Sequence, residues 1–425
     1  MKRNKRSFNT NFILFLLGRV VSDTGTSIQM MIMPLYIIDI GGGATTIGVF
    51  SFLSIIPALL VYPFAGVIGD RMNRKKIMVV TDLISAGVIL VLGWMSYLGI
   101  MRLSLLLIVQ VIISLMNGLF EPATRGMLPQ LVEKEELTKY NSTVASARSA
   151  SVLLGPVIGA ALYANFGVTL VFLVNGISFL LSGISEMIIR YTHTKQKTAK
   201  GAKGAKGTKG IMNDLVEGIK FVWQNLLIRK LSYFLLVSYF VIQPIFSVIL
   251  PLFFKGSLLY SDAQYGYLQT IIILGALLGS ILVGTLFGKE VRMLKPLVIG
   301  SSILLGAMLM FSVLLFPISI STLGNNTVIY FVLLAAVLGL FSAGNMFISV
   351  PIQTYIQQAT PNEYMSRVFS LVGMISRGGI PFGALIYGMI LEWAEMHWTV
   401  LITTVLMTFI IIMFLVSLTK TYSNK

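Results

Sequence analysis

Long apolar segments separated by short polar connections repeat from residue 12 to residue 418. A bilayer core of about 30 Å needs about 20 apolar residues per helix, so the pattern predicts about twelve membrane-spanning helices in two groups of six. The first group comprises Phe12–Ile38, Gly48–Ile68, Ile77–Leu98, Leu103–Pro122, Ser142–Tyr163 and Val168–Ile189. The second comprises Leu231–Phe254, Tyr265–Phe287, Lys295–Phe316, Val328–Pro351, Val368–Leu391 and Val400–Leu418. The predicted fold class is therefore all-α integral membrane.

Charged residues set the orientation of these segments. They make up only 11% of the chain, whose net charge is +16, and the bases gather in alternate connections. Lys and Arg are retained on the cytoplasmic side during insertion. With both termini cytoplasmic, Arg102 and Lys255 are the only bases in the outside loops. The pattern predicts a multi-pass protein of the plasma (inner) membrane and explains the bases without a nucleic-acid partner.

A long cytoplasmic connection joins the two groups. Its centre, Lys200–Gly210, is a Lys-Gly-rich run of the flexible, solvated kind. Residues Ile211–Trp223 then place apolar side chains at helical spacing, which predicts an amphipathic helix on the membrane surface. The lysines either bind anionic lipid headgroups or form a solvated tether. We expect an N-terminal bundle over 1–190, this linker over 191–230 and a C-terminal bundle over 231–425.

The two groups resemble each other in three places. Gly284–Arg292 repeats the pattern of Gly66–Arg74 with its bases but without its acid. Two weak similarities follow in the same order along both halves: residues 131–137 resemble residues 359–365, and residues 155–160 resemble residues 380–384. Internal repetition of this kind predicts duplicated bundles with a pathway at their interface.

Several classes of protein are disfavoured by what the sequence lacks. It has no phosphate-binding Gly-x-x-x-x-Gly-Lys-Ser/Thr loop and no cysteine, and His193 and His397 fall in predicted loops. We therefore expect no enzyme, no cofactor and no metal site. Transport driven by an ion or proton gradient remains.

The connection after the second segment carries a fingerprint. Gly66, Asp70, Arg71 and Arg74 resemble the motif Gly-x-x-x-Asp-Arg/Lys-x-Gly-Arg-Arg/Lys of the major facilitator superfamily, with Asn73 in place of glycine. Asn is the residue next to glycine in tolerating a left-handed turn, so the replacement is expected to preserve such a turn.

Two further stretches narrow the resemblance. Residues 121–141, with Pro122-Ala-Thr-Arg125 and Leu128-Pro129, and residues 361–370 are similar to the macrolide-efflux-like branch of that superfamily. The resemblance implies alternating access and export of drugs or other amphipathic molecules. It also implies that Asp70 lies near the start of the eleventh helix, where the helix dipole favours a carboxylate. The expected cytoplasmic gate comprises Gly66, Asp70, Arg71, Arg74, Glu121, Arg125 and Arg367.

Small residues in the fifth segment add a hint of antiport. Gly155, Pro156 and Gly159 are similar to a motif that antiporters of the superfamily carry there, although Ser142, Ser151 and Ala160 replace its other glycines. Ordinary close packing of helices explains the same residues equally well.

Ionisable and polar residues inside the segments are the remaining candidates. A buried charge costs a few kcal/mol, so Asp23, one turn after Arg19, either exchanges the coupling proton or forms a static ion pair with that arginine. A weaker set of cavity candidates, each equally compatible with packing, comprises Gln29, Met30, Arg148, Gln243, Phe246, Gln269, Asn345 and Arg377.

Together these features predict an exporter of small amphipathic molecules, coupled to protons, in which two bundles rock around a central cavity. The resemblance to the superfamily implies that it is a monomer. Three alternatives remain open at this point. They are export of an endogenous siderophore or peptide-like product, uptake, and a non-transporting membrane sensor whose output is the basic linker.

Overall fold

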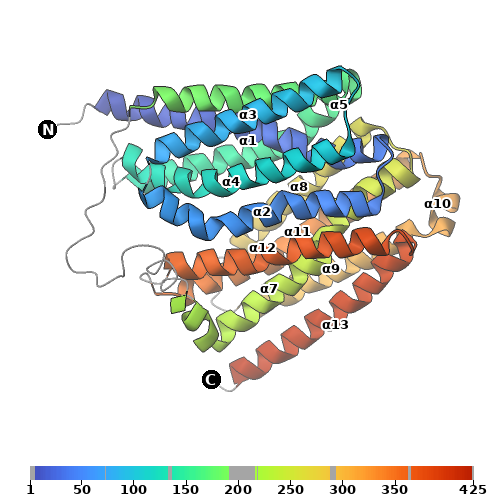
Figure 1. The fold of residues 1–425 in the computed structure, drawn as a ribbon. Helices are drawn as coiled ribbons and strands as arrows, with labels where there is room; N and C mark the ends of the chain where they lie inside the picture. The colour runs from blue at the N-terminus through green and yellow to red at the C-terminus, as the bar shows by residue number, and fades with distance from the viewer. Residues whose placement is uncertain are drawn as a thin grey trace. The chain divides into compact units, whose positions relative to one another are not determined.

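The computed structural model describes residues 5–71, 73–132, 136–190, 216–217, 219–287, 293–361 and 365–423, and these form helices and short connections without a strand (Figure 1). The helices of the first half are α1 (Lys5–Asp39), α2 (Ala44–Arg71), α3 (Arg74–Tyr97), α4 (Leu103–Leu131) and α5 (Leu137–Ile188). Those of the second half are α7 (Leu226–Pro244), the π-helical η2 (Ile245–Ile249) and η3 (Leu252–Ser257), α8 (Asp262–Phe287), α9 (Leu294–Leu315), α10 (Pro317–Leu323), α11 (Val328–Ala359), α12 (Met365–Ile390) and α13 (Met396–Ser423).

The predicted all-α membrane architecture is confirmed. Among the described residues, ten helices are long and apolar enough to cross a bilayer. Every segment expected from the hydrophobic pattern lies on a helix, although the fifth and sixth both lie on α5 and one expected segment continues from α7 through η2 and η3. The exact number of crossings stays a prediction.

A single glycine divides α5 into the two arms that the pattern separated. Gly167 has φ 72° and ψ −178°, a backbone conformation that side chains with a Cβ rarely adopt. The backbone leaves the helical conformation there, so α5 consists of two helices that meet at a kink. Hydropathy predicts the two arms, and the glycine permits the abrupt turn between them.

The chain forms two compact units. Met1–Gly41 with Leu53–Asn213 make the first, in which α1 and α3 pack on α5, and α4 packs on α3. Gly42–Phe52 with Asp214–Lys425 make the second, in which α8 and α9 pack on α11, and α7 packs on α12. The charged residues that matter below belong to the first unit.

The linker lies mostly outside the described residues, which exclude 191–215 and with them the Lys-Gly run. Residues 216–217 and 219–224 are helical. Val222 is buried, whereas Trp223 is 68% exposed and carries the Arg229 guanidinium 5.2 Å from its ring centroid. The end of this segment thus has one inward and one outward side.

Candidate functional site

The fingerprint connection holds the starts and ends of three helices together. Arg74 donates through Nη1 to the backbone carbonyl of Gly126 on α4. Lys75 donates through Nζ to the carbonyls of Met187, at 2.7 Å, and Ile189, at 2.8 Å. The carbonyls at the end of α5 have no partner within the helix, and a cation stabilises them. Arg74 and Lys75 therefore tie α3 to α4 and to the end of α5.

Gly126 lets the Arg74 guanidinium approach its backbone closely, and a larger residue would displace that side chain. A Cβ added at Gly126 would lie 2.6 Å from Cζ of Arg74. The side chains of Gly66, Asp70 and Arg71, at the end of α2, lie outside the described residues, as does that of Arg367 on α12. The role of these residues in a cytoplasmic gate therefore stays a prediction.

Asn73 does not adopt the left-handed turn expected of it. Its φ is −67° and its ψ is 113°, which is extended backbone open to any residue. Its side chain instead accepts a hydrogen bond from the backbone N–H of Lys76, at 3.4 Å. Asn73 is thus the N-cap of α3, one of the residue types preferred at that position, and the expectation of a left-handed turn was wrong.

A network of charged residues lies inside the first unit. Arg19, only 7% exposed, donates from Nε to Asp23 Oδ2 at 2.9 Å and from Nη2 to Glu121 Oε1 at 2.6 Å. Its Nη1 donates to the hydroxyl of Thr124 at 3.1 Å. Arg148 on α5 reaches the same Oε1 of Glu121 at 3.0 Å. Two cations and two anions balance one another, which is how a buried charge is tolerated.

The network unites residues that the sequence assigned to three separate roles. Asp23 and Arg19 were proton candidates, Glu121 belonged to the expected gate, and Arg148 to the cavity. Arg125, 3.8 Å from Glu121, has a side chain 74% exposed and contributes little. Sequence spacing placed Arg19 beside Asp23, but only the packing of α1, α4 and α5 brings the others to them.

This arrangement leaves the two acids partly accessible. The side chain of Asp23 is 21% exposed and that of Glu121 is 17% exposed, against 8% for Arg19. Arg19 is thus more enclosed than either of its carboxylate partners.

The small residues of α5 bring that helix against α1. A Cβ at Gly155 would lie 2.2 Å from Oγ of Ser27, and one at Gly159 would lie 3.3 Å from the carbonyl oxygen of Ile28. Pro156 lies between them and is buried. These residues serve close packing. Their proposed connection with antiport is not tested by this contact.

The uncharged candidates are scattered. Gln29 is buried and accepts a hydrogen bond from Asn175 at 2.6 Å, so it joins α1 to α5. Gln269 donates to the hydroxyl of Tyr265 at 2.8 Å. The ring of Phe246 lies 4.9 Å from that of Phe341. The side chains of Met30 and Gln243 are half-buried.

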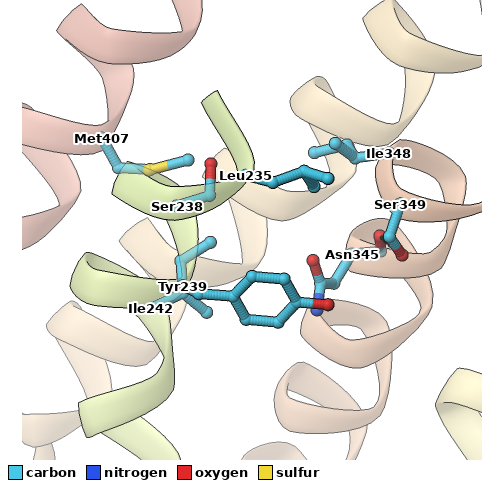
Figure 2. A pocket seen from close by; sticks show the side chains of 8 residues that line it. All are labelled: Leu235, Ser238, Tyr239, Ile242, Asn345, Ile348, Ser349 and Met407. Atoms are coloured by element: carbon cyan, nitrogen blue, oxygen red, sulfur yellow. Dashed lines mark hydrogen bonds between the residues drawn. The ribbon is translucent and has the colours of Figure 1, made fainter. Parts of the chain in front are cut away.

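A pocket in the second unit includes one of the candidates, Asn345 (Figure 2). Its cavity volume is about 10 Å³, which is barely room for one water molecule and far below the size of a ligand site. Its lining is apolar apart from a few side chains, and comprises Leu235, Ser238, Tyr239, Ile242, Asn345, Ile348, Ser349 and Met407. Arg377 is exposed and interacts electrostatically with Tyr239.

Two acids inside the predicted segments were missed. Asp82 on α3 and Glu186 on α5 are each only 2% exposed. Both could have been found by the rule that singled out Asp23, because an ionisable residue within an apolar segment is costly and usually has a role. They lie near the ends of their segments, where a charge is more easily attributed to the interface.

The comparison with known families matches these features. The model of the Major Facilitator Superfamily covers residues 15–384. The chain belongs to this family. Members of the Major Facilitator Superfamily are transporters rather than enzymes, and the chain is accordingly a multi-pass membrane transporter.

Relatives within the Major Facilitator Superfamily include efflux proteins. The chain is 26% identical over 391 residues to macrolide efflux protein A of Streptococcus pyogenes, covering 89% of each chain. It is 27% identical over 345 residues to macrolide efflux protein A of Enterococcus faecalis, covering 78% of this chain and 97% of the relative. Multidrug efflux pump Tap of Mycolicibacterium fortuitum is 22% identical, with 88% and 87% covered. The similarity to macrolide exporters is thus confirmed.

Solved structures show the same fold. A bacterial homologue of the iron transporter ferroportin aligns with a TM-score of 0.69 at 16% identity, over 95% of this chain and 98% of the other. The nucleoside transporter NupG aligns with a TM-score of 0.71 at 12% identity, over 96% and 98%. At such identities these likenesses support the architecture and carry no information on the substrate.

Proposed function

We propose that this transporter exports amphipathic small molecules, macrolides and other drugs among them, in exchange for protons and by alternating access. It does so as a monomer in the plasma membrane, with both termini cytoplasmic. The efflux relatives support the direction and the class of substrate. No cofactor takes part, and the energy comes from the proton gradient.

The observation that carries the proposal is the sharing of Arg19 between two carboxylates. Arg19 contacts Asp23 at 2.9 Å and Glu121 at 2.6 Å, and Arg148 competes for Glu121 at 3.0 Å. Protonation of Asp23 shifts the guanidinium toward Glu121, which in turn loosens Arg148, whose side chain is 48% exposed. If the proton and the substrate favour different arrangements of these groups, binding of one changes the affinity for the other.

Asp23→Asn tests the proton role. The amide keeps the shape of the protonated acid but cannot release a proton, so coupled efflux should fall by about tenfold or more. The variant and the wild-type chain are expressed in an efflux-deficient cell at matched membrane levels, and susceptibility to a panel of macrolides and other drugs is measured. We expect wild-type resistance to macrolides and its loss in the variant.

The same panel decides between substrates. Resistance to no drug in the wild-type strain would reject drug export and leave an endogenous product as the cargo. Full resistance in Asp23→Asn, together with unchanged substrate-driven proton movement across the membrane of everted vesicles, would remove Asp23 from the mechanism. An exporter moves its substrate into everted vesicles. Movement of the substrate out of those vesicles would instead indicate uptake.

Asp70→Asn tests the proposed gate. The bases of the fingerprint connection suffice to orient the chain, and the echo at Gly284–Arg292 keeps bases without the acid. We therefore expect normal insertion but severalfold slower efflux, because the carboxylate that stabilises one closed arrangement is lost. Membrane abundance is measured by immunoblot and efflux by dye or macrolide release. Normal efflux at normal abundance would make Asp70 a topological residue only.

A further inference from the structure

A second group of acids lies beside the Arg19 network. Asp82 on α3 and Glu186 on α5 are 2% exposed, and Ser182, one turn before Glu186, is fully buried. A Cβ added at Gly183 would lie 3.6 Å from Cβ of Asp82, and one added at Gly18 would lie 3.2 Å from Oγ of Ser182. The group therefore sits where α1, α3 and α5 meet.

Each of these three side chains has a buried oxygen that lacks a hydrogen-bond partner. Oδ2 of Asp82, Oε2 of Glu186 and Oγ of Ser182 are three of the buried side-chain atoms that lack a hydrogen-bond partner in the described part of the chain. Ser182 faces Asp82, but its Oγ makes no hydrogen bond of good geometry. No ion pair among the described residues includes either acid. Two ionised carboxylates in such a place would be very costly, whereas a protonated one supplies an O–H donor.

The surrounding charges are few and identifiable. Asp82 and Glu186 interact electrostatically with each other, and both interact with Arg19 of α1. Asp23 of α1 repels Asp82. From α4, Glu121 acts on Arg19. The guanidinium of Arg19 is therefore the cation that both groups of acids share.

We infer that Asp82 and Glu186 form a second proton-binding site, whose charge acts on Asp23 and Glu121 through Arg19. A proton bound there forms an O–H bond on one carboxylate. That O–H group donates a hydrogen bond to the other carboxyl or to the Ser182 hydroxyl. Release of that proton breaks the O–H bond and leaves a negative charge on the pair. That charge attracts the guanidinium of Arg19 and weakens its ion pair with Asp23. The inference rests on the proposed proton antiport for its role in transport, but proton binding at the pair stands independently of it.

Infrared difference spectroscopy tests the site on the purified full-length protein without any substrate. The carbonyl stretch of a protonated carboxylic acid is followed as pH is raised, in wild type, Asp82→Asn, Glu186→Gln and the double variant. We expect a titrating band in wild type that is lost in the double variant, while Asp23→Asn keeps it. Both substitutions preserve the shape of the protonated acid, so the fold should survive. A band that persists unchanged in the double variant, or the absence of one in wild type at neutral pH, would overturn the inference.

The role in coupling has its own readout. In proteoliposomes loaded with a radiolabelled macrolide, the double variant should keep downhill exchange but lose part of the pH dependence of gradient-driven transport. A wild-type pH profile in the double variant would reject the coupling to Arg19. If wild type itself ignores the pH gradient, proton antiport is wrong, whereas the infrared band still decides whether the pair binds a proton. A band that appears only when Na⁺ is withheld would assign the pair to cation binding and so overturn the inference.

Discussion

Arg19→Gln should abolish efflux and lower the stability of the first unit by about 3–5 kcal/mol, since it removes the partner of buried charges. Arg19 is the common cation of Asp23 and Glu121, and its removal leaves Glu121 with Arg148 and the exposed Arg125. The substitution also removes the cation–π contact in which Cζ of Arg19 lies 5.2 Å from the centroid of the Phe120 ring. Thermal unfolding in detergent and macrolide efflux measure the two effects.

Matched variants separate charge from shape. Arg19→Lys keeps the charge but not the planar fork that serves two carboxylates at once, so we expect it to recover stability more than transport. Glu121→Gln combined with Arg19→Gln removes one cation and one anion and should be more stable than Arg19→Gln alone. If the double variant is no more stable than the single one, the unpaired charge is not the source of the loss.

Gly383→Ala should destabilise the second unit by about 3 kcal/mol, the upper end for overpacking. A Cβ at Gly383 would lie 2.1 Å from the carbonyl oxygen of Phe240 and 2.9 Å from Cγ of Pro244. The first of these atoms is backbone, so α7 and α12 must separate to admit the methyl group. The unfolding temperature in detergent and the yield of monodisperse protein are the measurements.

Gly378→Ala is the control on the same helix. No atom lies within 4 Å of a Cβ added at Gly378, and alanine is otherwise the better helix former. We expect it to be neutral or slightly stabilising. Equal losses in both variants would show that helical glycine, rather than the close approach to Phe240, is what the second unit requires.

The candidate site was predictable residue by residue but not as a group. A buried charge is costly wherever it lies, so Asp23 and Arg148 stand out from hydropathy alone. Their association with Glu121 does not, because Glu121 is distant from both in sequence and could face any side of α4. The same limit applies to Gln29, whose polar side chain suggested a cavity although the structure pairs it with Asn175. Asn73 shows the reverse case, in which a turn residue was recognised but its conformation was not.

The sequence by itself determined the class of protein, the helical segments and the family. These depend on hydropathy, on the placement of Lys and Arg and on local motifs, all of which are read along the chain. Only the tertiary structure decided that Arg19 is shared by Asp23 and Glu121, and that Asp82 lies with Glu186. Those contacts join helices far apart in sequence, and the rotation of each helix about its axis is set by packing, with glycines such as Gly155 and Gly383 fixing how closely the backbones approach.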